Sequence, residues 1–121
     1  MKEEIGWTVH YVFGDTDYPN NTNAHSNGFE TKYNHLNIQI CLNIDPEIAN
    51  GIFWSISRLL DAGKKFSPAK KYANILVGVN VMFAYAKSNE EQVLRLIIPD
   101  VHGNLHSEMK AYKEQWDGVK I

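Results

Sequence analysis

The clearest structural signal in the sequence is the alternation of residues 36–42, where a large aliphatic side chain occupies every second position. These positions are Leu36, Ile38, Ile40 and Leu42. Successive side chains of a strand point to opposite faces, so a period of two predicts a strand with one apolar face. The preceding residues, 24–35, carry His25 and His35 on either side of a glycine. We therefore expect a histidine-bearing loop at the end of a strand, where rigid sheets often hold binding residues.

Three other segments have the character of strands. Residues 7–13 and 79–86 show the same alternation, and residues 93–98 are apolar on both faces except at Arg95. A run that is apolar on both faces is typical of a strand buried on both sides. Polar residues at 88–91 separate the last two segments, which predicts an antiparallel hairpin.

One long helix is predicted over residues 46 to about 62. Asp45 is a favoured N-cap residue, and Pro46 suits the first helical position. Apolar residues then recur at helical spacing, and Gly63 provides the C-terminal stop. These apolar residues are Ile48, Ile52, Ile56, Leu59 and Leu60.

The order strand, strand, helix, strand, strand and tail predicts an α+β fold in a single domain of residues 1–121. We expect a mostly antiparallel sheet of about four or five strands with one principal helix packed on one face. Residues 105–121 carry apolar side chains at helical spacing, so we expect a short C-terminal helix or strap there.

The sheet face away from the principal helix is expected to be too apolar to face water. Its residues would be Val12, Cys41, Met82, Ala84, Val93 and Ile97. The C-terminal segment or a second subunit should cover this face. We therefore expect a homo-oligomer, at least a dimer.

The charge of the chain is nearly balanced, with 12 lysine and arginine residues against 14 aspartate and glutamate residues. A net charge of -2 provides no attraction to duplex nucleic acid or to an anionic membrane. No apolar stretch approaches the roughly 20 residues of a membrane helix, and the Met-Lys-Glu-Glu start lacks the pattern of a secretory signal. Cys41 is the only cysteine, which excludes a disulfide within the chain. We expect a cytoplasmic protein whose partners include neither duplex nucleic acid nor a membrane.

Several residues could serve catalysis or metal binding, but each has a simpler interpretation. Four histidines could be metal ligands, although ordinary loop histidines are the alternative. They are His25, His35, His102 and His106. Reactive cysteines need an exposed electropositive setting, which Cys41 in mid-strand would lack. Asp15 and Asp17 follow a strand as in phosphoryl-transfer enzymes, but a solvated turn is the simpler interpretation. We expect no catalytic residue, no metal and no cofactor.

The remaining signals favour ligand binding. Residues 64–72 are basic and contain two aromatic side chains, and they complement the histidine loop. Lysines pair with anions and aromatic faces stack on rings, so the combination suits an anionic, ring-bearing small molecule such as a nucleotide. A solvated basic loop is the alternative interpretation. The candidate ligand-binding residues are His25, Ser26, Gly28, Phe29, His35, Lys64, Lys65, Phe66 and Asp100.

Several short motifs follow one another along the chain in a characteristic order. They are His-Ser-Asn-Gly-Phe at 25–29, Asn-His-Leu at 34–36, Asp-Pro-Glu-Ile-Ala at 45–49, Gly63 with Phe66, and Pro-Asp at 99–100 with Gly-Asn-Leu at 103–105. In this order and spacing the chain resembles the small bacterial and phage family catalogued as domain of unknown function number four-two-six-two. The resemblance covers residues from about 6 to 105. It implies a compact α+β domain and brings no established activity.

The resemblance also marks individual positions. The matching residues are His25, Gly28, His35, Phe66, Pro99, Asp100 and Gly103. Members often carry a second histidine where this chain has Asn27.

Three hypotheses for the function follow from these observations. The leading one is a non-catalytic, oligomeric protein that binds an anionic nucleotide-like molecule. By analogy of size and charge, it would act like the phage proteins that sequester a nucleotide immune signal. The second is a small hydrolase with His25 or His35 as general base. The third is a module that binds a protein partner through its apolar sheet face.

Overall fold

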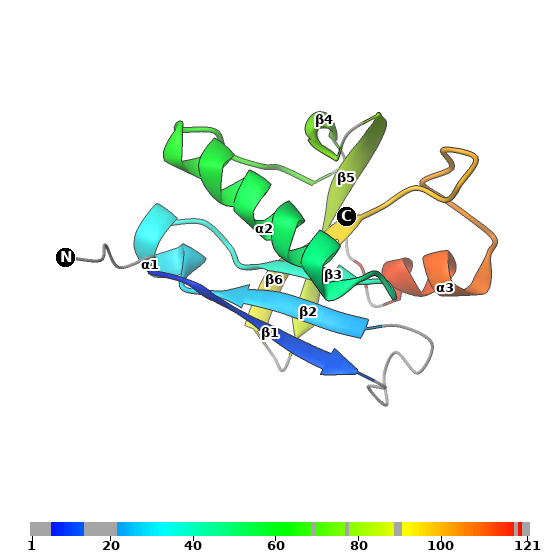
Figure 1. The fold of residues 1–121 in the computed structure, drawn as a ribbon, viewed down its shortest axis with the longest axis horizontal. Coiled ribbons are helices and arrows are strands. Elements are labelled where there is room, and N and C mark those ends of the chain that lie inside the picture. Colours follow the sequence, from blue (N-terminus) through cyan, green and yellow to red (C-terminus); the bar gives the residue numbers. More distant parts are fainter. Residues whose placement is uncertain are drawn as a thin grey trace.

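The computed structural model describes residues 6–13, 22–68, 70–76, 78–88, 91–117 and 119. These residues form one six-stranded sheet with the strand order β1-β2-β3-β6-β5-β4 (Figure 1). The strands are β1 (Thr8–Phe13), β2 (Thr22–Asn27), β3 (Ile38–Cys41), β4 (Lys71–Leu76), β5 (Val79–Ser88) and β6 (Glu91–Ile97). The helices are α1 (Phe29–Tyr33), α2 (Pro46–Asp61), α3 (Lys110–Lys113) and the 3-10 helix η1 (Glu114–Trp116). The fold is therefore α+β with one principal helix, as predicted.

The sheet is mixed, and the expectation of a mostly antiparallel sheet of four or five strands is wrong. Strand β3 runs parallel to β6, with Ile38 opposite Leu94 and Ile40 opposite Leu96. The chain leaves β3 through α2 and the β4–β5 pair before β6 returns beside β3. A connection of this length is what a parallel pair requires. The predicted hairpin of β5 and β6 is antiparallel, as expected.

The two strands that the sequence pattern did not reveal are β2 and β4. Residues 24–35, expected as a loop, form the second half of β2 and then α1. The expected basic connection at 64–72 ends in β4, an edge strand that starts at Lys71. Neither segment alternates between apolar and polar residues. Strand β2 is polar except at Ala24, and β4 has the sequence Lys-Tyr-Ala-Asn-Ile-Leu. The loop expected at 15–23 lies mostly outside the described residues.

Helix α2 begins and ends at the signals found in the sequence. The Asp45 carboxylate accepts a hydrogen bond from the backbone N–H of Glu47 at 2.8 Å, which caps the first turn. At the other end, Gly63 has a φ of 90°. This left-handed conformation lets the Gly63 and Lys64 N–H groups bond back to the carbonyls of Leu60 and Leu59, both at 3.0 Å.

The main core lies between α2 and one face of the sheet. The buried apolar residues of the helix are Ala49, Ile52, Phe53, Ile56 and Leu60. They pack with sheet residues that include Ile38, Ile40, Phe83, Leu94 and Leu96. Ile48, which was expected in this stripe, is 54% exposed, because it stands in the first turn beyond the edge of the core. Phe53 takes its place among the buried residues.

The second face of the sheet is covered partly by the C-terminal segment, one of the two covers expected from the sequence. Met82, Ala84 and Ile97 form a small core there. Leu105, Trp116 and Val119 pack against it. The Trp116 indole N–H donates to the carbonyl of Leu105 at 2.8 Å, which closes the segment on itself. The side chain of Val12 lies outside the described residues.

Buried polar groups attach the C-terminal segment to this face. The Arg95 guanidinium, which is fully buried, donates from Nε to the Gln39 side chain at 2.9 Å and from Nη1 to the carbonyl of Gln115 at 3.0 Å. It also donates to the carbonyl of Asp117. Gln39 in turn donates to the Asn23 side chain at 3.0 Å. A buried charge needs such partners, so these contacts account for an arginine in the middle of an apolar strand.

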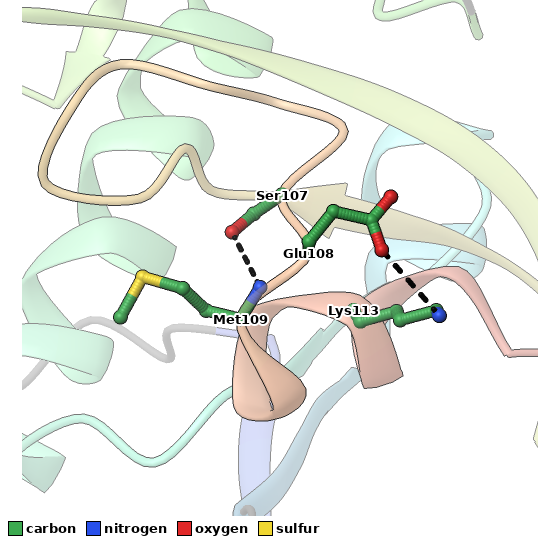
Figure 2. Close-up of polar contacts among 4 residues, drawn as sticks. All are labelled: Ser107, Glu108, Met109 and Lys113. Atoms are coloured by element: carbon green, nitrogen blue, oxygen red, sulfur yellow. Dashed lines mark hydrogen bonds and ion pairs between the residues drawn. The ribbon is translucent and has the colours of Figure 1, made fainter.

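The start of α3 is shown in Figure 2. The backbone N–H of Met109 donates to the Ser107 hydroxyl at 3.1 Å. Glu108 and Lys113 form an ion pair at 3.6 Å. Both of these charged side chains are largely exposed, so their ion pair contributes little to stability.

Candidate functional site

An open pocket of about 100 Å³ lies between the end of α2 and strand β4. Its lining comes from the last turn of α2, from the connection after it and from β4. The lining residues are Leu59, Lys64, Phe66, Lys71, Tyr72, Ala73 and Ile75. We call this the lysine–tyrosine pocket. Figure 1 shows the chain passing from the end of α2 to β4, and Lys64 and Phe66 of this connection belong to the lining.

The aromatic wall of the pocket is held firmly. Phe66 is 5% exposed and packs edge-on against Tyr72, with ring centroids 5.1 Å apart. Phe83 of the core lies behind both rings, at 4.9 Å from Phe66 and 5.5 Å from Tyr72. The Tyr72 hydroxyl accepts a hydrogen bond from the backbone N–H of Ser67 at 2.9 Å. These contacts fix the position of the wall, as a binding site requires.

Two lysines provide the positive charge of the pocket. Lys64 follows Gly63 at the end of α2, and Lys71 opens β4. Both side chains are exposed, and the Lys64 ammonium lies 5.9 Å from the centroid of the Tyr72 ring. Lys65 and Lys70 are also exposed, and they flank the lining residues in sequence without being part of the lining. The pocket therefore combines apolar walls with cations.

Strand β4 is irregular where it lines the pocket. Tyr72 is opposite Val81, whereas Leu76 is opposite Val79. Residues 73–75 thus face a single residue of β5, which makes a bulge in an edge strand. Bulges of this kind are common next to binding sites, because they redirect side chains and end regular pairing.

His35 is a buried residue that contacts Phe66 of the pocket lining. It is 8% exposed, and its Nε2 accepts a hydrogen bond from the backbone N–H of Phe66 at 3.3 Å. Its Nδ1 donates to the carbonyl of Leu36 at 2.7 Å. These partners require the neutral ring with the proton on Nδ1. Both ring nitrogens are engaged by the backbone, so His35 positions Phe66 and does not face a ligand.

His25 lies on the opposite face of the sheet from the pocket. Its neighbour Ala24 belongs to the core under α2, and successive strand residues point to opposite faces. The half-buried His25 ring stacks on the exposed ring of His10, with centroids 5.4 Å apart and planes 9° from parallel. The structure therefore does not bring His25 together with His35 or the lysines.

Ser26 and Phe29 are packing residues. Ser26 is fully buried, and its hydroxyl accepts from the backbone N–H of Ile38 at 2.9 Å and donates to Asn37 at 3.3 Å. Phe29 is fully buried and packs edge-on against Trp7, with ring centroids 5.4 Å apart. Neither side chain reaches the lysine–tyrosine pocket.

Gly28 is required by the backbone. Its φ of 105° is in the left-handed region, and a Cβ atom there would lie 2.4 Å from the carbonyl oxygen of Gly6. Glycine adopts this conformation readily and has no Cβ atom. It is therefore the residue that fits where the chain at Gly28 approaches the backbone of Gly6.

Asp100 organises the turn after β6. Its carboxylate accepts from the backbone N–H groups of His102 and Asn104 at 2.9 and 3.0 Å, and it also bonds to the Ser107 hydroxyl. These bonds, led by the one from Asn104, hold the pKa of the Asp100 carboxyl below its usual value. The same Ser107 hydroxyl accepts from Met109, so Asp100 connects the turn to the start of α3.

Of the residues predicted from the sequence, the structure brings Lys64 and Phe66 together in the pocket and places His35 directly behind them. Lys71 and Tyr72 belong to the basic, aromatic segment 64–72 that was expected to contribute to binding, although they were not among the candidate ligand-binding residues.

A second polar cluster, which the sequence did not indicate, joins α1 to the start of β6. The Asn37 amide donates to the carboxylates of Glu30 and Glu91 at 2.8 and 2.9 Å. The two carboxyl groups also share a hydrogen bond, and this bond raises the pKa of Glu30 above its usual value. The closeness of the two carboxyl groups therefore favours the protonated form of Glu30.

The part of the chain that the structure describes holds no group of three or more histidine, cysteine, aspartate or glutamate residues that could bind a metal. Among the described helices, none is long and apolar enough to cross a membrane. The Cys41 side chain is fully buried in β3.

The family model described as a domain of unknown function, DUF4262, matches residues 2–111. No curated protein and no solved structure matches the chain.

Proposed function

We propose that this chain, which belongs to the DUF4262 family of domains of unknown function, binds a small anionic, ring-bearing molecule such as a nucleotide in the lysine–tyrosine pocket. The match to the family confirms the resemblance seen in the motifs and assigns no activity. The single observation that carries the proposal is the lining of the pocket, in which Lys64 and Lys71 accompany Phe66 and Tyr72. The two lysines favour an anionic group. The ring-bearing character of the molecule is the expectation carried over from the sequence.

Binding without catalysis agrees with the contacts of the nearest histidine. A general base must reach the proton that it removes, and both ring nitrogens of His35 already bond to backbone groups. This favours a binding protein over the hydrolase in which His35 is the base.

We also propose the location, oligomeric state and origin that were expected from the sequence. The protein would be a cytoplasmic homo-oligomer of bacterial or phage origin, and sequestration of a nucleotide signal would be one role for it. A solution mass equal to one chain would overturn the oligomeric part alone.

The test is a thermal-shift screen with linear and cyclic nucleotides. A ligand that binds only the folded state raises the melting temperature as its concentration exceeds the dissociation constant. We expect at least one nucleotide to do so, and we expect it to be recovered unaltered after the protein is denatured. If no nucleotide raises the melting temperature, the proposal is wrong, and if the recovered nucleotide is hydrolysed, the protein is an enzyme.

A matched pair of variants locates the site. Lys71→Gln removes a pocket cation, whereas Lys87→Gln removes an exposed lysine of the neighbouring strand β5 that is not in the pocket lining. We expect only the first variant to weaken binding. Equal binding by both variants would place the nucleotide elsewhere on the chain.

A further inference from the structure

The size of the lysine–tyrosine pocket limits which part of a ligand can enter it. Its volume is about 100 Å³. Pockets that enclose a whole small molecule have volumes of about 300 to 1,000 Å³. A nucleotide therefore cannot be enclosed as a whole, and only one of its chemical groups fits.

The aromatic rings of the pocket are poorly placed to stack on a ligand ring. Phe66 is 5% exposed and is surrounded by Tyr72, Phe83 and His35. Tyr72 is contacted by Phe66 and Phe83, and the Lys64 ammonium lies 5.9 Å from its ring centroid. Its hydroxyl is bonded to the backbone of Ser67. Neighbouring side chains thus already cover much of both rings. His35, Tyr72 and Phe83 surround Phe66, and Phe66, Phe83 and Lys64 surround Tyr72.

The cations, in contrast, remain accessible. Lys64 and Lys71 reach the pocket from different segments, one at the end of α2 and one at the start of β4, and both side chains are exposed. A lysine ammonium is a compact charge with rotatable donors, so two of them suit an anion with several oxygen atoms. The exposed Lys65 and Lys70 add positive charge on either side.

We infer that the ligand enters the lysine–tyrosine pocket by a compact anionic group, with a terminal phosphate as the best fit, and that its ring stays outside the pocket. This inference rests on the proposed function and specifies which end of the ligand is recognised. It predicts that affinity depends on the phosphate and on the two lysines, and that the identity of the base matters little.

Competition between the parts of a nucleotide tests the inference. Adenosine 5'-monophosphate is bound first, and then adenosine or inorganic phosphate is added separately as competitor, with binding followed by calorimetry. We expect inorganic phosphate to displace the nucleotide and adenosine to leave it bound. We also expect Lys64→Gln and Lys71→Gln each to weaken phosphate binding by about tenfold, because each removes one charge-assisted contact. Lys87→Gln should bind phosphate as the unaltered chain does.

The outcomes separate the inference from the proposed function. If adenosine displaces the nucleotide and phosphate does not, the ring enters the pocket, and the inference fails while the proposed function stands. If phosphate competes but the two pocket variants bind it normally, the anion binds elsewhere and the inference fails. If neither adenosine monophosphate nor any other nucleotide binds, the proposed function fails, and the inference falls with it.

Discussion

At the scale of single residues, the side chain of Asn37 connects several separate segments of the chain. Its side-chain oxygen accepts from the Ser26 hydroxyl and from the backbone N–H of Phe29. Its amide nitrogen donates to Glu30 and Glu91. One buried amide thereby joins β2, α1 and β6 to the segment that leads into β3.

The carboxyl pair beside Asn37 makes stability depend on pH. The hydrogen bond with Glu91 raises the pKa of Glu30 above 4.5, so the folded chain holds a proton that the unfolded chain has already released. The free energy of unfolding must therefore fall as the pH rises from about 4.5 through the raised pKa. Glu91→Gln supplies a neutral partner, so this variant should lose that decrease and be more stable than the unaltered chain at neutral pH.

Urea unfolding over this range of pH is the measurement. Glu108→Gln is the control, because Glu108 is an exposed carboxylate paired with Lys113, away from the Asn37 cluster. A Glu91→Gln profile parallel to that of the unaltered chain would contradict the raised pKa of Glu30.

Gly28 gives a second prediction at this scale. Gly28→Ala should lower the free energy of unfolding by at least about 1 to 3 kcal/mol, which is typical of a strained backbone conformation. The clash of the new Cβ with the carbonyl of Gly6 adds to that loss, because 2.4 Å is far inside van der Waals contact. Thermal unfolding measures the effect.

Gly51 is the matched control. It lies exposed within α2, and a Cβ there would meet nothing within 4 Å. Gly51→Ala should therefore stabilise the chain by up to about 1 kcal/mol, because alanine favours a helix more than glycine does. Equal effects of the two substitutions would show that the backbone at Gly28 is not strained.

Individual site residues were only partly predictable. Lys64 and Phe66 were found because charge and aromatic character are visible in the sequence itself. The role of His35 was not, because the two backbone groups that occupy its ring nitrogens become visible only in the folded chain. His25 was grouped with His35 on proximity in sequence, although His25 lies within β2 and helix α1 separates it from His35.

At the scale of elements, the C-terminal end of α2 determines the position of the lysine–tyrosine pocket. The hydrogen bonds from Gly63 to Leu60 and from Lys64 to Leu59 form a Schellman motif. They end the helix at a fixed residue and direct the chain at Lys64 out of the helix. The positive charge of Lys64 and Lys65 also lies at the negative end of the helix dipole, where it is favourable.

The N-cap of α2 can be tested separately from its core. Asp45→Ala removes the acceptor of the Glu47 N–H and should lower the free energy of unfolding by about 1 kcal/mol. Asp61→Ala makes the same chemical change in the last turn of the helix, where a negative charge is unfavourable. Chemical denaturation should therefore show a loss for the first variant and none for the second. A loss of equal size in both would mean that the Asp45 cap contributes nothing specific.

Elements were predictable where local signals were sufficient. Helix α2 carries its own cap and stop, and β5 and β6 carry regular apolar patterns, so all three were predicted near their true bounds. Strand β2 was missed because its sequence, Thr-Asn-Ala-His-Ser-Asn, is polar except at Ala24 and so shows no apolar alternation. Its polar residues are stabilised by partners on other strands, as with Asn23 and Gln39, and the sequence of the strand contains no sign of them.

At the scale of the whole molecule, the sheet separates two environments. The face under α2 holds the main core and, at the β4 end, the lysine–tyrosine pocket. The other face carries the buried Arg95 cluster under the C-terminal segment and the stacked pair of His10 and His25 towards the β1 edge. The overall α+β class was predictable from the order of elements. The parallel pairing of β3 with β6 was not, because pairing between strands so distant in sequence depends on how the intervening helix and strands pack.

Gln115 is the residue through which the C-terminal segment is attached most directly to the sheet. It is fully buried, and its side chain accepts from the backbone N–H of Ile98 and donates to the Ile98 carbonyl, both at 2.9 Å. Gln115→Ala leaves both backbone groups of Ile98 without these partners, and a buried unpaired group costs about 1 to 3 kcal/mol. The segment that covers Met82 and Ile97 should then open more often than the rest of the sheet.

Hydrogen exchange measured along the chain distinguishes local opening from global loss of stability. Gln115→Ala should accelerate exchange in residues 105–117 while β3 and α2 retain their protection, since the Gln115 side chain bonds to Ile98 and Tyr112, which lie outside both elements. Lys113→Ala is the control, because it removes only an exposed ion pair with Glu108 and should change exchange little. Faster exchange spread evenly over the whole chain would mean that the C-terminal segment and the sheet unfold as one unit, and unchanged exchange would mean that the apolar contacts of Leu105 and Trp116 hold the segment without Gln115.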